Sequence, residues 1–77
     1  MALTSREWSS PPVPIQIAVD ASRCLVRIGD RVIPETVLGV GPETGEILAA
    51  GCHGEVVAMR FIGGERAFIV VIRPADT

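Results

Sequence analysis

The chain has 77 residues, a formal net charge of −2 and a hydrophobic fraction of 48%, and all seven of its basic residues are arginines. This length argues against more than one domain, and the acidic balance argues against a nucleic-acid-binding domain, which usually groups Lys and Arg on one face. The longest apolar run, residues 67–72, is far shorter than the roughly 20 residues of a transmembrane helix, so we expect no transmembrane segment.

Residues 1–14 are predicted to form a flexible tail rich in Pro and Ser, and residues 15–77 a single β domain. The last four positions of the tail hold three prolines, and proline neither continues a helix nor donates to a sheet ladder. Trp8, the only tryptophan, leaves two interpretations open: a contact with the domain or a partner, or an exposed aromatic in the tail. No apolar segment of the kind found in secretory signals follows the early charged residues, so we expect a cytoplasmic location.

From residue 15 onward, apolar side chains recur at every second position, which is the period of a β-strand. Glycine, proline and acidic residues separate these short runs and predict turns between them. We expect strands at 15–19, 24–28, 32–33, 37–40, 46–49, 55–61 and 67–73, and turns at 29–30, 41–45, 51–54 and 63–64. The last strand is apolar on both faces, which predicts a central position in its sheet.

Glycine or proline interrupts nearly every window of ten residues between positions 15 and 74, so we expect no helix of three turns. About seven short strands joined by glycine turns predict an all-β fold, a small barrel or sandwich.

Two segments of the chain are similar to each other. Residues 26–32 and 59–67 both read apolar, Arg, apolar, glycine, acid, Arg, apolar, and this similarity suggests two hairpin-like halves around one core. In such halves the arginines next to the turns would group on one surface and form a site for an acidic partner or an anion. The alternative is that they pair locally with Asp30 and Glu65, as exposed ion pairs of small energy.

Residues 26–32, Val37-Leu38 and residues 54–59 together resemble the biotinyl/lipoyl-like barrel-sandwich hybrid domains. Residues 50–68 are most similar to the modules of this type in subunits of Rnf-type and sodium-pumping NADH:quinone electron-transport complexes. The resemblance covers about residues 24–73 and implies a small barrel-sandwich hybrid. It also implies that the strand at 15–19 pairs near the last strand.

Carrier members of that family present a modified lysine on a tight hairpin. The matching stretch here is residues 42–46, with Gly45 near the place of the lysine, and the chain has no lysine at all. Arginine cannot replace lysine as the attachment point, because its guanidinium stays protonated. We therefore expect no biotin or lipoate on this chain, and no other cofactor.

The remaining candidates for chemistry are few. Cys52-His53 is the only pair of soft metal ligands, but neighbouring residues of a strand point to opposite faces and a metal site needs three or four ligands. We expect Cys52 to pack inward and His53 to face water, and neither to act as a nucleophile or base. A disulfide between Cys24 and Cys52 remains open. Glu43 and Glu46 are expected to be solvated charges.

These observations predict a non-catalytic protein-interaction domain without catalytic, cofactor-binding or metal residues. The expected contact residues are those of the glycine turn and the four repeated arginines: Pro42, Glu43, Thr44, Gly45, Arg27, Arg31, Arg60 and Arg66. One alternative is an accessory domain of a redox or electron-transport assembly, and another is a carrier scaffold that a ligase still recognises. The edges of so small a sheet also leave room for a homodimer.

Overall fold

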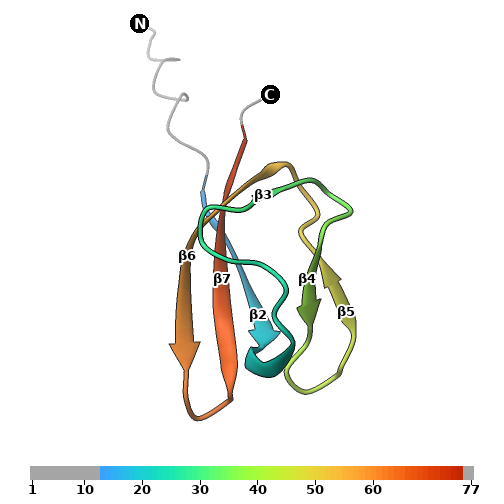
Figure 1. Ribbon diagram of the computed structural model, residues 1–77, viewed down its shortest axis with the longest axis vertical. Coiled ribbons are helices and arrows are strands. Elements are labelled where there is room, and N and C mark those ends of the chain that lie inside the picture. Colours follow the sequence, from blue (N-terminus) through green and yellow to red (C-terminus); the bar gives the residue numbers. More distant parts are fainter. Residues whose placement is uncertain (1–12, 76–77) are drawn as a thin grey trace, which may run out of the picture.

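The computed structural model describes residues 13–75, which form six strands and one 3-10 turn (Figure 1). In chain order these are β2 (Ile15–Asp20), η2 (Ala21–Arg23), β3 (Arg31–Val32), β4 (Val37–Val40), β5 (Ile47–Ala49), β6 (Gly54–Ile62) and β7 (Ala67–Pro74). The predicted all-β fold is confirmed. Most of the predicted N-terminal tail, Trp8 included, lies outside the described residues.

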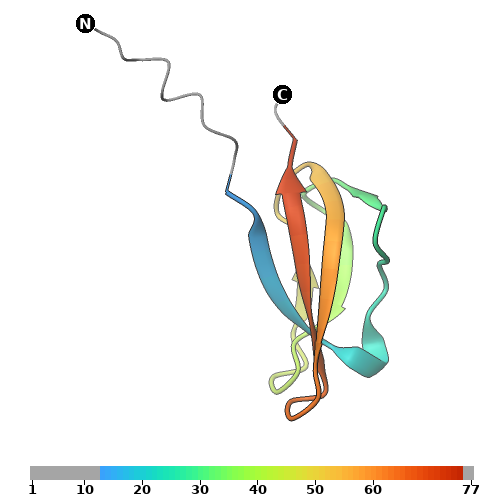
Figure 2. The ribbon, with the colours of Figure 1, turned by 90° about the vertical axis from the view of Figure 1, so that its left-hand side faces the viewer.

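The strands form one four-stranded antiparallel sheet in the order β2-β7-β6-β3 and one two-stranded sheet, β4-β5. β7 is an inner strand, as the apolar pattern predicted. The first described strand pairs with the last, from Ile15 opposite Ile72 to Asp20 opposite Ala67. The larger sheet curls into a half-barrel, and the β4-β5 hairpin lies against its concave side (Figures 1 and 2).

The hydrophobic core lies between these two layers. Val19, Val56 and Ile72 from the larger sheet and Leu38 from β4 are completely buried. The layers also touch through backbone at Gly39, where an added Cβ would clash with the carbonyl oxygen of Arg23 and lie 2.5 Å from Cγ1 of Val19. Alternate residues of each strand thus fill one shared core, as a period of two requires.

The prediction of a strand at residues 24–28 is wrong. The N–H of Leu25 donates to the carbonyl of Leu38 at 2.9 Å, but the chain then turns away from this neighbour. The carboxylate of Asp30 accepts a hydrogen bond from the Arg27 N–H at 2.9 Å, and Gly29 has a φ of 99°. An aspartate that binds the backbone in this way favours a turn over a ladder, whatever the apolar pattern.

The two similar segments do not form similar hairpins. Residues 63–66 are a tight turn between the paired strands β6 and β7. Residues 29–30, in contrast, lead from the irregular segment 24–28 into β3, which is only two residues long. The expectation of two equivalent hairpin halves is therefore wrong, because only the second copy has an adjacent strand on each side of its turn.

Candidate functional site

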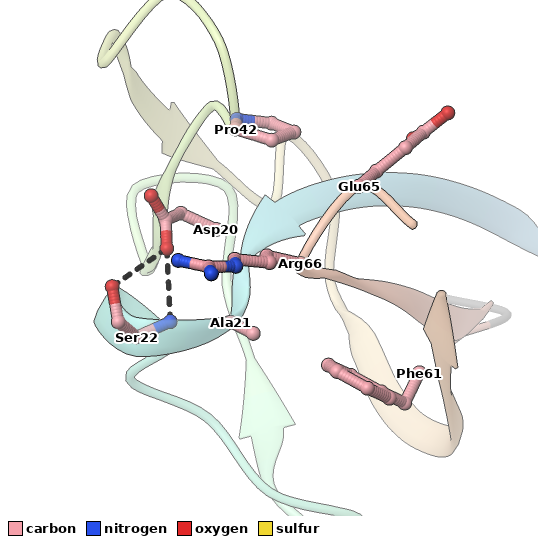
Figure 3. Close-up of a pocket in the computed structure, with 7 residues that line it drawn as sticks. All are labelled: Asp20, Ala21, Ser22, Pro42, Phe61, Glu65 and Arg66. Atoms are coloured by element: carbon pink, nitrogen blue, oxygen red, sulfur yellow. Dashed lines mark hydrogen bonds between the residues drawn. The ribbon is translucent and has the colours of Figure 1, made fainter. Parts of the chain in front are cut away.

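Three turns meet at one end of the molecule, the lower end in Figure 1: η2, the turn between β4 and β5, and the turn between β6 and β7. An open groove of about 520 Å³ lies among them (Figure 3). We call it the three-turn groove. Its lining residues are Asp20, Ala21, Ser22, Pro42, Phe61, Glu65 and Arg66.

Asp20 ends β2 and caps the 3-10 turn that follows. Its Oδ1 accepts hydrogen bonds from the backbone N–H of Ser22 at 2.9 Å and from the Ser22 hydroxyl at 2.7 Å. The hydroxyl hydrogen bond and then the backbone hydrogen bond of Ser22 lower the pKa of Asp20, and desolvation opposes them, while the positive charge of Arg23 is the weakest of the causes that lower it. The wall that this turn forms therefore carries a carboxylate that stays ionised at neutral pH.

Pro42 belongs to the turn that the sequence predicted between two short strands. The Gly41 N–H donates to the Glu46 carbonyl at 2.8 Å, and the Gly45 N–H donates to the Gly41 carbonyl at 3.1 Å. The Thr44 hydroxyl accepts a further hydrogen bond from the Glu46 N–H at 3.2 Å. The turn is thus closed by its own hydrogen bonds, and it presents Pro42 to the groove as a preformed surface.

Phe61 contributes the aromatic surface of the groove. It lies opposite Phe68 in the β6-β7 ladder, and the two rings have centroids 5.5 Å apart at 58°. Phe68 packs against the core, whereas 59% of Phe61 is exposed. The two rings therefore form a continuous apolar surface, with Phe68 at the core and Phe61 in the groove.

Arg66 ends the β6-β7 turn in an unusual backbone conformation. Its φ of 52° is the one positive φ of a residue other than glycine in the described chain. This conformation costs an L-residue roughly 1–2 kcal/mol. The Arg66 carbonyl accepts the Ala21 N–H at 2.9 Å, which joins this turn to η2. Figure 3 shows the Arg66 side chain reaching along the groove toward Asp20, while Glu65 points away from it.

The arrangement is suited to binding. An apolar surface from Pro42 and Phe61 is bordered by the carboxylates of Asp20 and Glu65 and the guanidinium of Arg66. Neither Cys nor His lines the groove. In residues 13–75, no cluster of three or more His, Cys, Asp or Glu side chains could hold a metal ion. A partner side chain with an apolar body and a polar end would find both kinds of contact there.

Of the predicted contact residues, the structure brings only some together. Pro42 and Arg66 line the groove, and Glu43, Thr44 and Gly45 are exposed on the same turn as Pro42. Asp20, Ser22 and Phe61 were missed. For the first two a signal exists, because an aspartate two residues before a serine at a strand end is a turn-capping pattern.

The four arginines do not converge, which corrects the expected arginine surface. Arg31 lies opposite Glu55 at the start of β6, whereas Arg66 follows the end of that strand. Seven strand residues between them correspond to roughly 23 Å. Arg60 lies opposite Ile69, on the sheet face away from the core. Arg27 precedes the turn at residues 28–29 and is exposed.

The expected local ion pairs with Asp30 and Glu65 are not present either. Within the described part of the chain, the single ion pair joins Arg73 Nη2 to Glu55 Oε1 at 3.4 Å, and both side chains are exposed. Asp30 instead binds the backbone of Arg27. These two partners of the ion pair also line a second, smaller depression of about 270 Å³ near the start of β6 and the end of β7.

The predicted orientation of the Cys52-His53 pair is confirmed. Cys52 is half-buried and packs against the core, while His53 is exposed. Cys24 also packs against the core, and its thiol lies 3.6 Å from the Val26 carbonyl oxygen. Both cysteines are free, so the structure contains no Cys24–Cys52 disulfide.

No helix among the described residues has the length and apolar character needed to cross a membrane. Comparisons with protein-family models, with curated proteins and with solved structures found no match for this chain.

Proposed function

We propose that this chain is a non-catalytic, biotinyl/lipoyl-like protein-interaction domain that works in the cytoplasm and docks a partner in the three-turn groove. The observation that carries the proposal is the groove itself, which lies beside the β4-β5 turn. In carrier domains, the resemblance implies, this turn presents the modified lysine. Here it carries Pro42 beside an exposed aromatic ring and no lysine.

The composition of the groove supports docking of a protein. Aromatic residues and arginine are enriched at protein interfaces and among the residues that dominate their binding energy. Phe61 and Arg66 supply one of each, and the exposed ring of Phe61 would bury its apolar surface on contact. The ionised Asp20 adds a hydrogen-bond acceptor that orients a polar partner group.

The backbone of Arg66 is a second support. Glycine adopts a φ of 52° without strain, so an arginine at this position destabilises the free domain. Strained residues cluster at binding sites, where the side chain serves binding although it lowers the stability of the fold. A partner that contacts the Arg66 guanidinium would account for an arginine at this turn.

Site-specific photo-crosslinking tests the proposal. A photoreactive phenylalanine analogue replaces Phe61 in one variant and Ile47 in a matched control, because Ile47 is also apolar and is 73% exposed on β5. In cells that make the protein, we expect a partner to crosslink from position 61 and not from position 47. Binding of the purified partner should then fall at least about tenfold in Phe61→Ser, the loss typical of an interface hot spot, and stay unchanged in Ile47→Ser.

Two outcomes would contradict the proposal. One is a partner that crosslinks equally from both positions, and the other is a partner whose affinity is the same for Phe61→Ser and the original chain. Arg66→Gly provides an independent check, since it removes the guanidinium without straining the turn. We expect it to weaken binding while the domain remains folded.

A further inference from the structure

We propose that β2 pairs with β2 of a second copy of this chain, in an antiparallel register centred on Ala18. The two larger sheets would then form one continuous sheet across the dimer. This interface uses an edge of the sheet and shares only Asp20 with the lining of the three-turn groove, so it goes beyond the proposed partner docking.

β2 is a six-residue edge strand of the larger sheet. It is the outermost strand on one side of the larger sheet (Figure 2), and no described strand pairs with its outer side. Natural edge strands are usually protected by charged side chains, proline or a β-bulge. β2 contains no proline, its one charged residue is Asp20 at its end, and its pairing with β7 is regular throughout. A second free edge, along β6, is interrupted by a bulge at Val57 and carries Arg60.

The existing ladder shows which backbone groups of β2 are available. The Ala21 N–H donates to the Arg66 carbonyl, on the side of β7. In an antiparallel ladder, each residue points its N–H and C=O to the same neighbour, and successive residues alternate. Val19 and Ile17 therefore bind β7, while Gln16, Ala18 and Asp20 present their N–H and C=O groups to the open side.

These three residues define one favoured register. Directly opposed residues share a face, so self-pairing is centred on one residue. With Ala18 at the centre, Ala18 faces its own copy, Gln16 faces Asp20 of the second chain, and all these residues exchange both backbone hydrogen bonds. Centring on Ile17 would oppose Asp20 to Pro14, and centring on Val19 would oppose Gln16 to Ser22, whose N–H already binds Asp20. Centring on Asp20 would oppose two carboxylates. Centring on Gln16 would oppose Asp20 to residue 12 and Ala18 to Pro14, and proline has no N–H to donate.

Side chains complement each other in the same register. Ser22 binds Oδ1 of Asp20, which leaves Oδ2 as the acceptor for the amide N–H of Gln16 in the second copy. This contact occurs twice by symmetry. On the core face, the half-buried Ile17 would lie opposite Val19 of the second copy and lose more of its exposed surface.

Sedimentation equilibrium of the full chain tests the association. We expect a species of twice the 8.2 kDa chain mass at raised concentration. Ala18→Lys opposes two ammonium groups at the symmetry axis and should raise the dissociation constant at least about tenfold. Gln16→Lys, which faces Asp20, should lower it several-fold at low salt, and Gln16→Glu should raise it. Glu46→Gln matches the charge change of Gln16→Lys on an exposed turn and should change nothing.

Disulfide trapping tests the register itself. Ala18→Cys should form an intermolecular disulfide rapidly, because opposed residues of a hydrogen-bonded pair have Cα atoms about 5.5 Å apart. Gln16→Cys is the matched control on the same strand and face, since its two copies would lie roughly 13 Å apart. Circular dichroism confirms that each variant is folded.

Three results would overturn the proposal. The first is a chain that stays monomeric at all concentrations. The second is an Ala18→Lys variant that is folded and still dimerises as the original chain does. The third is trapping that is no faster for Ala18→Cys than for Gln16→Cys.

Discussion

The two hairpins of this domain use the same local signal and end in different environments. Each joins two apolar strands through a turn containing glycine. The strands of the β6-β7 hairpin have nine and eight residues, and β7 lies between two neighbours. The strands of the β4-β5 hairpin have four and three residues, and Ile47 on its outer side is 73% exposed.

The comparison teaches that strand length does not measure what a hairpin contributes to the core. Leu38 of the short hairpin and Ile72 of the long one are equally and completely buried, because each fills the same space between the layers from opposite sides. We therefore treat the short hairpin as the second wall of the core.

The largest expected effect on stability comes from removing a buried side chain from each hairpin. Leu38→Ala and Ile72→Ala should each lower the free energy of unfolding by about 2–5 kcal/mol, through lost burial and a cavity. Ile47→Ala, in the same short hairpin, should cost less than about 0.5 kcal/mol because its side chain is exposed. Urea unfolding followed by circular dichroism measures all three. A loss below about 1 kcal/mol for Leu38→Ala would show that the short hairpin contributes little to the stability of the core.

A second prediction concerns the contact between the layers. Gly39→Ala should cost about 1–3 kcal/mol, because the new Cβ would clash with Arg23 and Val19 and the φ of 150° is unfavourable for alanine. Gly64→Ala is the matched control in the other hairpin, since a Cβ there meets nothing within 4 Å and its φ is ordinary. Equal stability of the two variants would show that the layers can separate at Gly39 without cost.

The turns of the two hairpins differ at one comparable position. Gly45 and Arg66 both have a left-handed backbone, with φ of 70° and 52°. Arg66→Gly should raise the free energy of unfolding by up to about 1 kcal/mol, and Gly45→Ala should lower it by a similar amount. Arg66→Ala, which removes the side chain and keeps the strain, should give no gain. A loss of stability in Arg66→Gly would contradict the assignment of strain.

The smallest effect lies where both turns meet η2. The lowered pKa of Asp20 means that its carboxylate stabilises the folded domain above pH 3.8, and this contribution disappears as the pH falls through the lower folded value. Carbon-detected NMR titration should place the Asp20 pKa below 3.8, and Ser22→Ala should raise it by removing the first of its causes. An Asp20 pKa that Ser22→Ala leaves unchanged would assign the shift to the backbone N–H of residue 22, which the variant keeps, rather than to the lost hydroxyl.

Local patterns were sufficient for the strands and turns that pair with sequence neighbours. The turns at 41–45 and 63–64 and the inner position of β7 follow from glycine and from an apolar run without alternation. The segment at 24–28 shows where this reasoning stops. Its alternation is that of a strand, but Asp30 captures the Arg27 N–H and no neighbouring strand competes for it.

The three-turn groove could not be predicted from the sequence as a whole. Its residues come from positions 20–22, 42, 61 and 65–66, and no spacing along the chain relates them. The similarity between residues 26–32 and 59–67 identified only Arg66 of the groove, since the other three arginines of the two copies lie elsewhere on the domain.

By itself, the order of apolar residues, glycines and prolines determined that this chain is all-β, because period-two burial and left-handed turns are properties of neighbouring residues. The absence of lysine likewise excludes the attachment of biotin or lipoate to a lysine amine within these 77 residues, on chemical grounds alone. Only the tertiary structure decided which turns meet, which arginines separate and which strand edge stays open. Those outcomes depend on how the two layers close over a common core, and closure joins residues that no local interaction connects.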